Sequence, residues 1–179
     1  MIFDVRRTSV EGDAIRLGGL RLGLEYKRVN RFGIGVYGLD NQIVREITSE
    51  AGAIDTIAYN FGYTTLFYER ILWFHPKWEW SAAVHFGSGT IQSNRLNLDP
   101  EDPAKFEEIQ VRPFELSTST YYNLTWWLSI GGGAGYRVMR KTPTDVRDAY
   151  NGFIYIAKVK FRLLKIIKSK FNEDVKDEY

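Results

Sequence analysis

The sequence contains no cysteine, only five prolines and almost no net charge. The lack of cysteine excludes disulfide scaffolds, cysteine-ligated zinc and thiol nucleophiles. Because 24 Lys and Arg residues nearly balance 22 Asp and Glu residues, a protein that binds nucleic acid through bulk charge is not expected. A hydrophobic fraction of 44% excludes general disorder.

The chain also lacks a long apolar run. Its longest uncharged stretch, residues 116–136, contains Asn123, several Ser and Thr and three consecutive glycines, and would make a poor membrane helix. Residues 1–20 contain no apolar core of signal-peptide length. We therefore expect either a cytoplasmic chain or numbering that begins after processing or within a fragment.

The chain is instead rich in aromatic residues (15%) and glycine (16 residues), which suggests many strands. Apolar and polar residues alternate with a period of two in seven segments, which predicts strands with two chemically different faces. An eighth strand, residues 1–8, is less certain because only Phe3 and Val5 alternate with Asp4 and Arg6. The seven clearer segments are 15–27, 32–37, 57–67, 78–87, 114–122, 128–138 and 153–163.

Short and long connections alternate along the chain. The short ones surround residues 29–31, 75–77 and 123–125, and the longer polar ones are 40–55, 92–105 and 141–149. In an up-and-down meander, this order puts every short turn at one end of the sheet and every long loop at the other.

The alternation leaves open which face points inward. A soluble lipocalin-like barrel buries its aromatic face, whereas an outer-membrane barrel turns it toward lipid. All five tryptophans flank two of the short turns, as an aromatic girdle at a membrane interface requires. The expected girdle residues are Trp73, Trp78, Trp80, Trp126 and Tyr122.

Two further features favour the membrane. The polar face is rich in Gly, Ser and Ala with isolated charges, which suits a narrow lumen. The apparent strands also exceed the ~5–6 residues usual in globular proteins and reach the ~9–11 that span a membrane. On the 57–67 strand this assignment turns Phe61, Tyr63 and Phe67 toward lipid. Glu69 then falls on the lipid face, which a bulge or an interfacial position would explain.

The alternation, the turn order, the tryptophans and a last strand reading FIYIAKVKF resemble a small bacterial outer-membrane β-barrel of the OmpA/OmpX size. The resemblance spans residues 14–163 and is one of architecture without a specific motif. It implies an all-β, antiparallel, up-and-down transmembrane barrel of eight strands with periplasmic termini and exterior loops. Unlike such chains, this one continues past the last aromatic residue of its final strand. We expect residues 1–163 to form the barrel and residues 164–179 a basic, then acidic tail.

An eight-stranded barrel leaves room only for side chains, so a diffusion porin is not expected. The inward charges would form a salt-bridge network, because buried charges must be paired, or else a proton relay or small binding site. The predicted lumen residues are Arg21, Glu25, Glu79, His85, Glu115, Arg137, Lys158 and Lys160, with Arg162.

No residue set predicts a reaction, a cofactor or a metal. His85 and Ser88 lie three apart, so on one strand they face opposite sides. The glycines of 131–135 lack the Lys-Ser/Thr of a phosphate loop and suit close strand packing. The acidic loop 98–108 lacks the ligand spacing of an EF-hand. The tail 163–171 is a basic amphipathic helix or the frayed end of the last strand.

We therefore expect a non-enzymatic outer-membrane barrel that serves as a structural element, an anchor or an accessory subunit of an envelope assembly. Its partners would be the lipid bilayer and, through the loops or the tail, other outer-membrane or periplasmic proteins. One alternative is a soluble lipocalin-like binder of an apolar ligand. Another is a lipid-modifying barrel enzyme, which would need His85 near a nucleophile and a carboxylate from other strands.

Overall fold

The computed structural model of the protein describes residues 1–10, 13–40, 43–48, 54–95, 107–140, 150–163 and 166–167. Strands dominate this part of the chain, as the period-two alternation predicts. The strands are β1 Ile2–Val10, β2 Asp13–Tyr26, β3 Asn30–Leu39, β4 Ile43–Thr48, β5 Ile54–Phe74, β6 Trp78–Arg95, β7 Glu107–Asn123, β8 Leu128–Arg140 and β9 Gly152–Phe161.

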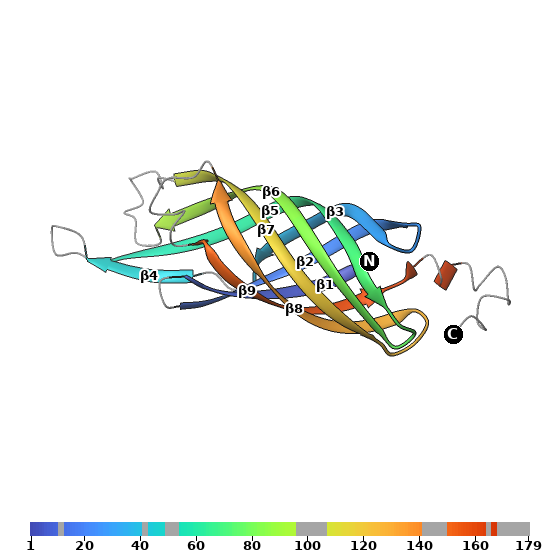
Figure 1. Ribbon diagram of the computed structural model, residues 1–179. Helices are drawn as coiled ribbons and strands as arrows, with labels where there is room; N and C mark the ends of the chain where they lie inside the picture. Colours follow the sequence, from blue (N-terminus) through green and yellow to red (C-terminus); the bar gives the residue numbers. More distant parts are fainter. Residues whose placement is uncertain are drawn as a thin grey trace.

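Eight of these strands close into an antiparallel barrel (Figure 1). Neighbours in sequence pair with each other, β1 pairs with β9, and β3 pairs with β5 to complete the ring. Strand β1 pairs on both edges over nearly its whole length, so the least certain predicted strand is a full member of the wall. The predicted eight-stranded up-and-down barrel is confirmed.

Strand β4 lies outside the ring and corrects one prediction. Residues 40–55 were expected to form a polar loop, but Ile43–Thr48 pairs with Ile54–Tyr59 and extends the sheet beyond the barrel. The β-branched residues of this segment favour a strand despite its charges. In the predicted loop 92–105, residues 92–95 instead continue β6. Residues 96–105, the whole predicted loop 141–149 and most of the acidic loop 98–108 lie outside the described residues.

The short turns gather at one end of the barrel, opposite β4 (Figure 1). In the β2–β3 connection, residues 27–29, Lys27 and Arg28 both have positive φ, 52° and 54°, as the two central residues of a type I′ turn require. The α-amino group of Met1 donates to the carbonyl oxygen of Phe161 at 3.0 Å, so the start of β1 and the end of β9 meet at this same turn end.

Within the described residues, no helix is long and apolar enough to span a bilayer. Residues 163 and 166–167 are helical, and the N–H of Ile166 donates to the carbonyl oxygen of Arg162 at 3.2 Å. The rest of the tail predicted to be amphipathic, through residue 171, lies outside the described residues.

The two side-chain faces of strand β5 point in the opposite directions from the prediction. Phe61, Tyr63 and Phe67 are buried inside the barrel, whereas Leu66 is 64% exposed on the outer face. The lumen accepts these rings because glycines lie beside them on the neighbouring strands: Gly89 is paired with Tyr63, and Gly33 with Phe67. The side chain of Glu69 therefore points inward, as the regular alternation of β5 requires. The register shift in the pairing of β5 with β6 lies further along the strand, between Ile71 and Trp73.

Candidate functional site: the filled lumen and the aromatic turn end

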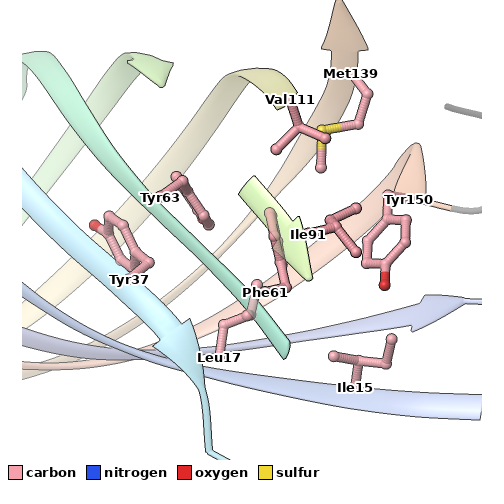
Figure 2. Close-up of a cluster of buried hydrophobic side chains, with 9 residues drawn as sticks. All are labelled: Ile15, Leu17, Tyr37, Phe61, Tyr63, Ile91, Val111, Met139 and Tyr150. Atoms are coloured by element: carbon pink, nitrogen blue, oxygen red, sulfur yellow. The ribbon is translucent and has the colours of Figure 1, made fainter. Parts of the chain in front are cut away.

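The loop half of the lumen is filled by an apolar cluster (Figure 2). Its aromatic rings stack on one another, with centroids 5.0 Å apart for Tyr37 of β3 and Tyr63 of β5 and 5.1 Å apart for Phe61 and Tyr63, both of β5. Tyr150, just before β9, adds a ring 5.4 Å from Phe61. The cluster comprises Ile15, Leu17, Tyr37, Phe61, Tyr63, Ile91, Val111, Met139 and Tyr150.

On the turn side of this cluster, a first group of charged side chains surrounds Glu115. Its carboxylate accepts from Nε of Arg137 at 2.6 Å and from the hydroxyl of Tyr63 at 2.9 Å, and it also pairs with Arg6. The Arg6 guanidinium lies 3.8 Å from the centre of the Tyr37 ring. Two guanidinium groups thus share one carboxylate in a site closed to solvent.

A second group of charges fills the turn half of the lumen. Glu69 pairs with Arg31 at 2.9 Å and with Arg21 at 3.3 Å. Glu79 pairs with Arg31 at 2.5 Å and with Lys160 at 2.8 Å. The side chains come from five different strands, so these ion pairs join opposite walls of the barrel.

The two groups are joined by Asp4, which lies 3.2 Å from Nε of Arg21 and 3.4 Å from Arg6. Lys158 completes the polar interior: its ammonium donates to the hydroxyl of Ser119 at 2.6 Å and lies 5.6 Å from the centre of the Tyr121 ring. Six buried cations and four buried carboxylates are thus present among the described residues. Five of these cations are paired with a carboxylate, as buried charges require, and Lys158 has the Ser119 hydroxyl instead.

His85 has no catalytic geometry within the described residues. Its imidazole is buried, stacks on Phe67 at 5.7 Å, and has no hydrogen-bond partner on either nitrogen. Ser88 is exposed, so the two residues are not brought together. No group of three or more His, Asp or Glu side chains in the described residues could hold a metal ion.

Most of the residues predicted to face the lumen are buried there: Arg21, Glu79, His85, Glu115, Arg137, Lys158 and Lys160. Glu25 differs, because its side chain lies at the turn-end rim, 43% exposed and 2.7 Å from Nε of Arg31. Arg162, just beyond β9, is half-buried at the same rim. The interior also contains four charged residues that the sequence analysis did not assign to it: Asp4, Arg6, Arg31 and Glu69.

The tryptophans at the turn end lie on the outer surface. Trp78 and Trp80 alternate with the buried Glu79 and Ser81, so their rings face outward and are about half-exposed. Trp78 packs edge-on against Tyr122 at 4.9 Å. Trp73, 52% exposed at the end of β5, stacks on His75, and Trp126 lies in the β7–β8 turn.

No protein-family model and no curated protein sequence matches the chain. A solved structure similar to this one is the crystal structure of Ail, the attachment invasion locus protein of Yersinia pestis, with a TM-score of 0.50. The match covers 89% of this chain and 93% of Ail at 12% sequence identity, so it bears on the fold alone. The chain has the architecture of a small outer-membrane β-barrel.

Proposed function

We propose that the protein is a non-enzymatic barrel of the bacterial outer membrane that acts as a structural element, an anchor or an accessory subunit of an envelope assembly. The observation that supports this is the reversal of polarity across the wall. Charged side chains are buried inside, while large apolar side chains cover the outside, an arrangement that lipid stabilises and water does not. The outward residues include Leu24, Val36, Leu66, Phe86, Leu116, Phe153 and Tyr155.

In this proposal the turn end, where the tryptophans gather, lies at the periplasmic interface, and the loop end with β4 faces the exterior. Indole rings favour an interface because the ring is apolar and its N–H seeks a polar partner. The lipocalin-like alternative needs room inside for an apolar ligand. The apolar cluster and the ion pairs already occupy both halves of that space.

Fractionation of bacterial cells tests the location. We expect the protein in the membrane fraction, soluble only with detergent, and with an unboiled form that migrates differently from the boiled one. Recovery as a monomer without detergent would contradict the proposal.

Orientation is tested with single cysteines, since the native chain has none. A membrane-impermeant maleimide should label Glu108→Cys, at the loop end of β7, in intact cells. It should label Lys77→Cys, in the exposed β5–β6 turn, only after the outer membrane is permeabilised. The opposite pattern would invert the proposed topology.

A further inference from the structure

A groove of about 610 Å³ opens at the turn end of the barrel, where β2 runs beyond its pairing with β1. The last pair between these strands is Ile2↔Arg21, whereas β2 continues to Tyr26. Met1 and the segment after β9 line the same groove, so it lies between the β2–β3 hairpin and the two ends of the barrel chain. Its volume is within the range of small-molecule sites.

The groove walls are largely apolar and belong to the outer surface. Leu22 and Leu24 of β2 lie beside Ile34 and Phe32 of β3, and all four are exposed in the proposed lipid-facing belt. On the opposite wall, Leu163 and Ile167 present two more exposed apolar side chains. An alkyl chain lying here would have apolar side chains to contact on both sides.

The barrel wall is thin at the bottom of the groove because Gly23 and Gly33 form a cross-strand pair without side chains. A Cβ at position 33 would lie 2.0 Å from the carbonyl oxygen of Leu22, so a side chain does not fit there. The lining of the same groove also includes the interior residues Arg21 and Arg31.

Positive charge dominates the polar part of the lining. Among the described residues, four cationic side chains line the groove, Arg21, Arg31, Lys160 and Arg162, together with the α-amino group of Met1, against one carboxylate, Glu25. The first three have carboxylate partners in the lumen. The side chain of Arg162 donates instead to two neutral oxygens, the carbonyl of Trp126 at 3.2 Å and the side-chain oxygen of Asn123 at 2.8 Å.

Arg162 also lies at the height of the aromatic turn end. Its backbone N–H donates to the carbonyl oxygen of Trp127 at 2.9 Å, and the Trp127 ring stacks on Phe161. A cation at the level of interfacial tryptophans is at the level of lipid headgroups, with the apolar part of the groove beside it.

We propose that this groove binds one anionic phospholipid, with an acyl chain between the β2–β3 hairpin and Leu163/Ile167 and the phosphate on Arg162. The charge of the lining and the outward, apolar walls favour a lipid over a peptide strand paired to the free edge of β2. The site rests on the proposed membrane location, but its test is made in detergent, so it can fail while fractionation still supports that location.

Native mass spectrometry of the full chain in a neutral maltoside detergent tests the site. We expect one dioleoylphosphatidylglycerol to be retained per barrel, at least fivefold more tightly than dioleoylphosphatidylcholine. Arg162→Gln should weaken binding of the anionic lipid about fivefold, the contribution of one cation near a charged headgroup. The matched control is Arg70→Gln, because Arg70 is exposed on the outer face of β5 and does not line the groove.

A second pair of variants tests the acyl chain. Leu163→Gln should weaken binding of phosphatidylglycerol, and Leu124→Gln, which changes an exposed leucine of the β7–β8 turn, should not. Heat-modifiability on a gel verifies that each variant is folded. Equal retention of both lipids, equal effects within either pair, or displacement of the lipid by an equal concentration of sn-glycerol 3-phosphate would overturn the proposal.

Discussion

Replacing Glu115 by Gln should be the most damaging conservative change in the lumen. Glu115 is 1% exposed and is the shared partner of Arg6 and Arg137. The amide keeps the shape of the side chain but removes its charge, which leaves two buried guanidinium groups without their common carboxylate. Breaking a buried pair in this way costs about 3–5 kcal/mol, against ~0–1 kcal/mol for an exposed one.

Urea unfolding of the detergent-solubilised barrel, followed by the loss of the compact band on an unheated gel, measures this cost. With a slope of about 2 kcal/mol per molar urea, a loss of ~4 kcal/mol lowers the midpoint by about 2 M. Glu108→Gln, an exposed carboxylate on the same strand, is the control and should change stability by less than ~0.5 kcal/mol. Equal midpoints for the two variants would refute the reasoning, because they would mean that water screens the Glu115 site.

Three further outcomes are expected. Gly133→Ala should destabilise the barrel by about 1–3 kcal/mol in the same urea assay, because the new Cβ would lie 2.2 Å from the carbonyl oxygen of Thr118. Gly132→Ala, whose Cβ would lie 3.6 Å from its nearest neighbour, should leave the stability nearly unchanged. A larger loss of stability in Gly132→Ala than in Gly133→Ala would contradict the close packing of β7 and β8. In liposomes, lipids brominated near the headgroup should quench tryptophan fluorescence more than lipids brominated at the chain end. Trp80→Phe should reduce that difference in quenching. Stronger quenching by the lipids brominated at the chain end would place the indoles in the bilayer centre. In planar bilayers, the purified barrel should carry no steady current, because the apolar cluster and the ion pairs fill its lumen; a stable conductance would contradict a filled interior.

The strands and the barrel were predictable because period-two alternation is a direct consequence of backbone geometry. The order of short turns and long loops then implied a meander. Strand β4 was missed because it is only six residues long and lies in a polar segment, where its β-branched residues were the one signal. Its pairing with β5 is decided by the length of that neighbouring strand, 21 residues, which extends well beyond the wall of the barrel.

The interior was predictable where a charge stood alone on a polar face, as for Arg137 and Lys158. Arg31 was missed because it was assigned to a turn, whereas the type I′ turn ends at Val29 and β3 begins at Asn30. Asp4 and Arg6 belonged to the strand with the weakest pattern. The pairing of Arg6 with Glu115 also depends on a contact between β1 and β7, two strands far apart in sequence, which the local pattern of the chain does not contain.

Strand β5 shows how its two faces could have been distinguished from sequence. A run of aromatic residues suits either side of the wall, because rings pack inside the lumen as well as against lipid. A charge on the lipid face, by contrast, is unfavourable, by up to about 2–4 kcal/mol for an Arg or Lys at mid-membrane and by less for a carboxylate, and the whole strand shares one alternation. Within residues 61–74 of β5, each face carries one charge, Glu69 or Arg70, but only the long arginine side chain can extend along apolar surface to the headgroups. The short glutamate has to face Arg21 and Arg31 inside, and it carries Phe61, Tyr63 and Phe67 inward with it.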